Sequence, residues 1–172
     1  MGLTTFNGIP IHPLLVHFVV VLVPLSALLL LSSVCWPAAR RRLGLITPIV
    51  ALVSLVLVPL TTEAGEWLED RTPRDPLVRI HAELGDQLVF WSAGVFLVSL
   101  AWWAMHEPRI RAWWVKRAKF ESAQVSRVVA VGLAVVGIAL AAGSVVQVYR
   151  IGDSGAAAVW SDPAGTAATQ VK

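Results

Sequence analysis

The sequence predicts an all-α protein, a four-helix transmembrane bundle with a short amphipathic helix at its cytoplasmic interface. Three observations support this prediction. Of the 172 residues, 56% are hydrophobic and only 15% are charged, whereas soluble domains carry about 25% charged residues. Four apolar segments are each about long enough to cross a bilayer as a helix. Most of the tryptophans lie close to the ends of these segments, as aromatic belts at membrane surfaces do.

We expect one transmembrane domain over residues 1–150, followed by a mobile outer tail over 151–172. The expected spans are 13–34, 43–62, 80–105 and 128–148. The first span lacks a preceding positive cluster, and its apolar run is longer than that of a signal peptide. It is therefore expected to be retained as a helix.

Prolines and glycines mark the ends of the first two spans. Asn7-Gly8, together with Pro10 and Pro13, predicts a turn that leads into the first helix. Pro24 lies in the middle of that span and predicts a kink. The second span is expected to lead into a charged loop over residues 63–78.

The third helix is expected to begin near Leu77, so that His81 lies in its early turns. The segment 108–120 mixes five basic residues with tryptophan, isoleucine and phenylalanine. This composition is typical of a helix that lies in the cytoplasmic interface against anionic lipid. Beside membrane spans, lipid is a better partner for such a segment than nucleic acid, so no nucleic-acid binding is expected.

The charges divide between the two ends of the predicted bundle. The loops after the first and third spans hold nine basic and two acidic residues, whereas the opposite end holds five basic and nine acidic residues. Basic residues concentrate in cytoplasmic loops. Both termini are therefore expected outside the cell, together with three of the four histidines.

Small residues indicate which helix faces look inward, because they allow close helix contacts in lipid. One face of the fourth span carries them at alternating spacings of four and three: Ala130, Ala134, Gly137, Ala141 and Ser144. On the third span, Gly85, Ser92 and Ser99 are seven residues apart, and His81 precedes Gly85 by one turn. We therefore expect His81 to face the bundle interior.

His12, His17 and His81 lie at the same predicted mouth of the bundle, where ionisable residues are functional candidates. His17 lies inside the apolar run and should face protein or water. His12 precedes it by five residues, about 140° around an ideal helix. The two can share a face only if His12 lies outside the helix, which the following Pro13 would favour.

Several functions fit these residues, and the sequence alone does not choose among them. In the first, His17 and His81 are the axial ligands of a haem b, with His12 as an alternative ligand, and a membrane or periplasmic redox partner is expected. In the second, His12, His17, His81 and Glu66 bind a divalent metal or copper. In the third, a scaffold or partner subunit uses a structural histidine–carboxylate network. A fourth is a proton or substrate relay.

Motifs of soluble enzymes are absent: the sequence has no phosphate loop, no HExxH and no GxSxG. Whether the protein is an enzyme, and its oligomeric state, therefore stay open.

The run from Gly8 to Phe18, with its His-Pro-x-x-Val-His-Phe element, resembles the opening motif of DUF2231, a family of small bacterial membrane proteins. The Gly65-Glu66 pair and His81 are also similar to the family pattern, and the resemblance covers roughly 8–148. It implies a four-helix domain in the bacterial plasma membrane and carries the site over to His12, His17, His81 and Glu66. Some relatives are joined to iron–sulfur or cytochrome-type domains, which favours a redox role. Val19 departs from the pattern, which often has proline there.

Overall fold

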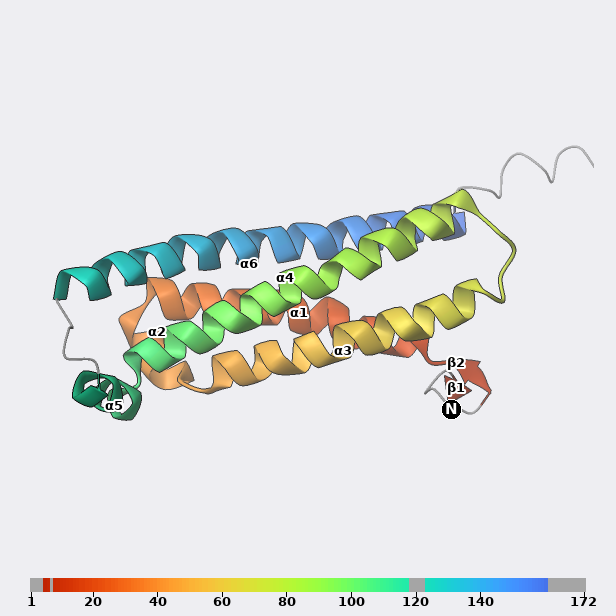
Figure 1. Cartoon of the computed structure of the whole chain (residues 1–172). Coiled ribbons are helices and arrows are strands. Elements are labelled where there is room, and N and C mark those ends of the chain that lie inside the picture. Colours follow the sequence, from red (N-terminus) through yellow and green to blue (C-terminus); the bar gives the residue numbers. More distant parts are fainter. Residues whose placement is uncertain (1–4, 7, 118–122, 161–172) are drawn as a thin grey trace, which may run out of the picture.

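Four long helices lie side by side in an elongated bundle (Figure 1). The computed structural model describes residues 5–6, 8–117 and 123–160. The long helices are α1 (His12–Cys35), α3 (Ile46–Glu69), α4 (Pro76–His106) and α6 (Ala123–Trp160). Each is long and apolar enough to cross a membrane. The predicted all-α, four-span bundle is confirmed.

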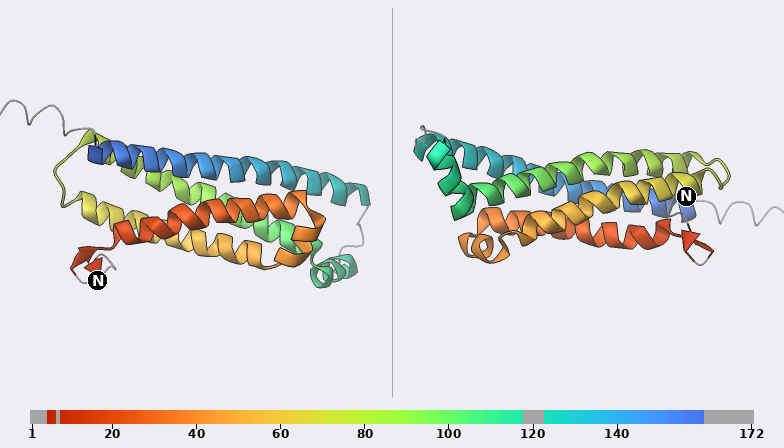
Figure 2. Two further views of the ribbon diagram at one scale, coloured as in Figure 1. Left: turned by 180° about the vertical axis from the view of Figure 1, so that it is seen from behind. Right: turned by 60° about the horizontal axis from the view of Figure 1, so that its bottom comes forward.

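Each long helix packs against two neighbours, in the cyclic order α1, α3, α4 and α6 (Figure 2). The start of α1, the end of α3, the start of α4 and the end of α6 therefore meet at one end. This end carries His12 and His81, and we call it the histidine end. The opposite end carries α2 with Arg40, Arg41 and Arg42, and we call it the arginine end.

Short elements connect the helices at both ends. The strands β1 (Thr5–Phe6) and β2 (Ile9–Pro10) form an antiparallel hairpin. Its turn includes Gly8, whose φ of 78° favours glycine, so the predicted turn is confirmed. At the arginine end lie α2 (Pro37–Leu43) and α5 (Pro108–Arg117). The helix at α5 agrees with the predicted short amphipathic helix.

Two helices are longer than predicted. The segment 63–69, expected in a loop, continues α3. Residues 151–160, expected in the mobile tail, continue α6, while 161–172 lie outside the described residues. The prediction ended both spans where polar residues appear. A helix that leaves the bilayer needs no apolar outer face, however, and small residues such as Gly155 still pack against His81 of α4.

The interior combines apolar layers with paired hydroxyls. Val19, Val23, Val58 and Leu88 form one buried cluster near the histidine end, and a second surrounds Leu30. Hydroxyl pairs join α1 to α3: Ser26 to Ser54 at 2.8 Å and Ser33 to Thr47 at 3.2 Å. The predicted small-residue faces are confirmed for the residues Ser92, Ser99, Gly137, Ala141 and Ser144, which are all buried.

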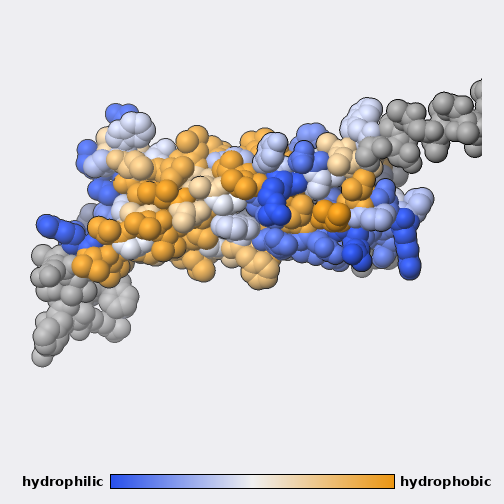
Figure 3. Space-filling view, turned by 90° about the horizontal axis from the view of Figure 1, so that it is seen from above, coloured by the Kyte–Doolittle hydropathy of each residue, from blue (hydrophilic) through white to orange (hydrophobic). Residues whose placement is uncertain are grey.

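On the face shown in Figure 3, apolar side chains cover the middle of the bundle and polar side chains gather toward its ends, more extensively at the histidine end. Many large hydrophobic side chains of the bundle are exposed, among them Val21, Phe90 and Val135. A soluble monomer rarely exposes so large an apolar area. This surface is suited to contact with lipid acyl chains.

Candidate functional site

His12 is the first residue of α1, and its helical position determines its direction. The buried residues Val19, Val23 and Leu30 follow it by seven, eleven and eighteen positions. At about 100° per residue these intervals return to nearly the same side of the helix. His12 therefore belongs to the inward face of α1.

His81 lies in the second turn of α4 and also faces inward. Its Nδ1 is 2.9 Å from the carbonyl oxygen of Ile151 on α6 and 3.3 Å from the hydroxyl of Ser154. Nδ1 of His12 is likewise 2.9 Å from the carbonyl oxygen of Thr61 on α3. Because a carbonyl only accepts, Nδ1 of each ring donates. In the neutral imidazole this leaves the Nε2 lone pair available on both rings.

A glycine lies against each ring. Gly65 follows Thr61 by one helical turn, and Gly155 follows Ile151 by one turn. A β-carbon at position 65 would lie 2.9 Å from Cε1 of His12, and one at position 155 would lie 3.0 Å from Cε1 of His81. Both distances are shorter than ordinary van der Waals contact. The two imidazoles thus occupy equivalent seats, each made of a helix carbonyl and the glycine four residues later.

The two rings lie close to each other at the centre of the histidine end. Their centroids are 6.4 Å apart and their planes are perpendicular. A cavity of about 260 Å³ opens beside them, between the ends of α3, α4 and α6. Glu66, Glu69 and Asp86 line the same cavity and make its rim acidic. A smaller cavity of about 60 Å³ lies among buried valines and Leu88 on the bundle side of the rings.

His17 is not brought to this pair. Its side chain is exposed, and its Nδ1 bonds the carbonyl oxygen of Pro13 on the same helix. The reason is that His12 lies inside the helix, so the two histidines point about 140° apart. The sequence predicts that His17 faces protein or water and pairs with His81, with His12 as the alternative; in the structure His12 takes the inward position and His17 is exposed.

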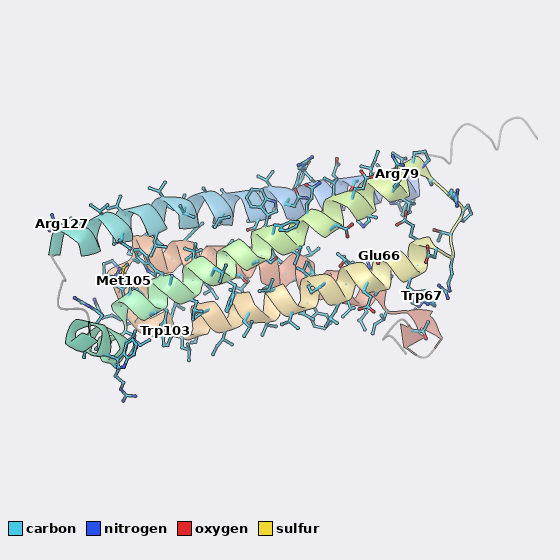
Figure 4. The ribbon with its side chains drawn as sticks, in the orientation of Figure 1. Glu66, Trp67, Arg79, Trp103, Met105 and Arg127 are labelled. Carbon is cyan, nitrogen blue, oxygen red and sulfur yellow. The ribbon has the colours of Figure 1, made fainter. Side chains whose placement is uncertain are left out.

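The four residues proposed as a metal site are not gathered into one cluster. Glu66 is exposed near the end of α3 (Figure 4). Within the described ranges, no three His, Cys, Asp or Glu side chains are close enough to hold a metal ion. His106 lies at the arginine end, where its Nδ1 bonds the carbonyl oxygen of Trp102.

Sequence reasoning missed Gln147, which is buried on α6. Its amide Nε2 donates to the carbonyl oxygen of Leu84 at 2.7 Å, one turn of α4 beyond His81. The signal was present, because Gln147 is a lone amide inside the fourth apolar segment and such groups need a partner. The bond helps to fix α6 against α4 beside the His81 seat.

No curated protein matches this chain, and no solved structure does. The DUF2231 family, described as a predicted membrane protein, matches residues 8–168, which is nearly the whole chain. The chain therefore belongs to the DUF2231 family of predicted membrane proteins.

Proposed function

We propose that this membrane protein holds a haem b between His12 and His81 and acts as an electron-transfer module. One observation carries the proposal: two imidazoles, each fixed through Nδ1 by a helix carbonyl, lie with their centroids 6.4 Å apart. A metal–imidazole bond of about 2.0 Å and a ring radius of about 1.1 Å would place two axial ring centroids about 6.2 Å apart. The separation in this protein agrees with that value.

The number of ligands favours haem over a bare metal ion. Two histidines alone do not complete a four-coordinate zinc site, and no third ligand lies close to them in the described part of the chain. A haem supplies its own four equatorial nitrogens, so two axial histidines suffice. The cavity beside the rings, about 260 Å³, is slightly below the usual range of about 300–1,000 Å³ for ligand pockets.

When bound, the haem would supply one-electron transfer. The chain would provide the ligands and their environment. The bonds from Nδ1 to Thr61 and Ile151 fix both rings and make Nε2 a better donor to a metal. The acidic rim formed by Glu66, Glu69 and Asp86 favours the more positive, oxidised state and thus a lower reduction potential.

We further propose that the arginine end is cytoplasmic, in the plasma membrane of a bacterium. The concentration of basic residues at that end supports this orientation. Both termini and the histidine pair would then face outward, toward a membrane or periplasmic redox partner.

A second function is supported by the same hydrogen bonds. The His12–Thr61 bond joins α1 to α3, and the His81–Ile151 bond joins α4 to α6. Two part-buried hydrogen bonds of this kind, each joining a pair of helices, would suit a non-catalytic scaffold or partner subunit. In that case the histidines contribute to stability and no cofactor is involved.

The decisive experiment is a reduced-minus-oxidised absorbance spectrum of protein purified in mild detergent after expression with ample haem. We expect a b-type α-band, a shifted Soret band and about one haem per chain. His12→Ala and His81→Ala should each abolish the low-spin spectrum, because each removes an axial ligand. His17→Ala is the matched control and should keep it.

A flat wild-type spectrum would remove the haem proposal, and lower thermal stability of the His12 and His81 variants alone would then favour the scaffold. A spectrum lost in His17→Ala and kept in His12→Ala would move the ligand assignment to His17.

A further inference from the structure

A second cavity lies at the arginine end, far from the histidine pair. It has a volume of about 370 Å³ and opens between α1, α2, α3 and α4. Hydroxyl residues of three helices line it: Ser33, Thr47 and Ser99. Arg40, Arg41 and His106 also line it, together with one acidic residue, Glu107.

The arginines of this cavity have no carboxylate partner. In the parts of the chain that are described, the only ion pair joins Arg79 to Glu83 at the histidine end. Arg40 is half-buried, and its guanidinium carbon lies 5.8 Å from the ring centroid of Trp102. That indole is fixed by a hydrogen bond from Nε1 to the carbonyl oxygen of Ser33. Arg40 is thus held at the cavity without an ion pair to any described carboxylate.

The hydroxyls include an unused donor. Ser33 and Thr47 bond each other at 3.2 Å. Ser99 is only 1% exposed, and among the described residues its hydroxyl finds no hydrogen-bond partner. A buried hydroxyl without a partner costs about 1–3 kcal/mol. The side chain would therefore gain from an acceptor in the cavity.

We propose that this cavity binds a phosphate group carried by an anionic phospholipid of the surrounding membrane. Guanidinium and hydroxyl donors together match the oxygens of a phosphate. The location indicates a lipid source, because the cavity lies where the spans end. Trp103 and Met105 mark this end in Figure 4, and Trp103 lines the cavity. Tryptophans gather at the depth of the lipid headgroups, where basic pockets between helices bind anionic lipids.

The test compares two arginines of the same short helix. The full chain is purified in detergent and titrated with phosphatidylglycerol or phosphatidylcholine, with binding followed by native mass spectrometry. We expect the wild type to prefer phosphatidylglycerol. Arg40→Gln should weaken that binding about tenfold, since it removes a charge-assisted bond. Arg42→Gln should bind as the wild type does, because Arg42 is equally basic but does not line this cavity.

Further variants and ligands cover the remaining outcomes. Ser99→Ala removes the buried donor without changing the charge and should weaken binding several-fold, which keeps the test valid if Arg40→Gln does not fold. Inorganic phosphate at millimolar concentration should not displace the lipid. Displacement by phosphate alone would overturn the lipid source. If Arg40→Gln and Arg42→Gln weaken phosphatidylglycerol binding equally, or if the wild type shows no preference for the anionic lipid, the proposed site is wrong.

Discussion

At the scale of single residues, the histidine end depends on two glycines as much as on two imidazoles. Each ring needs a helix carbonyl at hydrogen-bond distance and an open helix surface one turn further on. Any side chain at position 65 or 155 would occupy the space of the ring. The glycines thus allow the imidazoles to lie against neighbouring helices with Nδ1 bonded, so that only Nε2 is left for chemistry.

Gly65→Ala and Gly155→Ala should therefore displace His12 and His81 respectively. The added methyl group forces each ring away from its carbonyl, and we expect a loss of about 1–3 kcal/mol in the free energy of unfolding. Thermal unfolding in detergent, followed by circular dichroism, measures the loss. Gly152→Ala is the control, because a β-carbon there meets nothing within 4 Å. It should be neutral or stabilising by up to about 1 kcal/mol, as alanine favours helix. Equal changes in the free energy of unfolding for Gly152→Ala and Gly155→Ala would contradict the claim that Gly155 makes room for His81.

The sequence predicted which way His81 faces, but it did not predict that His12, rather than His17, lies next to it. Periodicity placed His81 on the inward face, because Ser92 and Ser99 mark that face. Which of His12 and His17 faces inward depended on the backbone conformation of His12, the residue before Pro13. If His12 is helical, the two side chains point in different directions. Proline disfavours that conformation for its predecessor, but His12 begins α1 and its ring is bonded to Thr61. A tertiary contact overrode a local preference.

At the scale of helices, hydropathy located the four spans but not their ends. The bilayer sets the length of an apolar run, whereas a helix ends where its caps and contacts end. α4 begins at Pro76, and the side chain of Asp75 accepts from the amide of Leu77. That start agrees with the expected one near Leu77. α6 continues past the apolar run to Trp160, and there its residues Ile151 and Ser154 contact His81 of α4.

The end of α6 should therefore be needed for the His81 seat. A chain that stops after Arg150 lacks the Ile151 carbonyl, Ser154 and Gly155, and we expect its free energy of unfolding to fall by about 1–3 kcal/mol. The thermal midpoint would fall by about 2–4 °C for each kcal/mol in a chain of this size. A chain that stops after Trp160 retains all atoms of the seat and serves as the control. Identical midpoints for the two truncations would show that residues 151–160 do not support His81.

At the scale of the whole molecule, the two halves of the chain have the same order of elements. A long helix, a short helix and a long helix make up α1–α3, and the same order recurs in α4–α6. In each half a histidine early in the first long helix bonds a carbonyl of the second. The ring pair thus lies where the halves meet. The sequence did not reveal this arrangement, because the spacing from histidine to bonded carbonyl differs, 49 residues in one half and 70 in the other.

This arrangement makes the orientation of the protein in the membrane testable with two positions. The start of α1 and the end of α6 belong to the histidine end, and α2 belongs to the arginine end. The chain has a single cysteine, so Cys35→Ser gives a thiol-free background. In that background Asp70→Cys and Ala38→Cys place one exposed thiol at the histidine end and one at the arginine end. If basic residues face the cytoplasm, a membrane-impermeant maleimide should label Asp70→Cys in intact cells and Ala38→Cys only after permeabilisation. The opposite pattern would place the histidine pair in the cytoplasm, and with it any partner that exchanges electrons there.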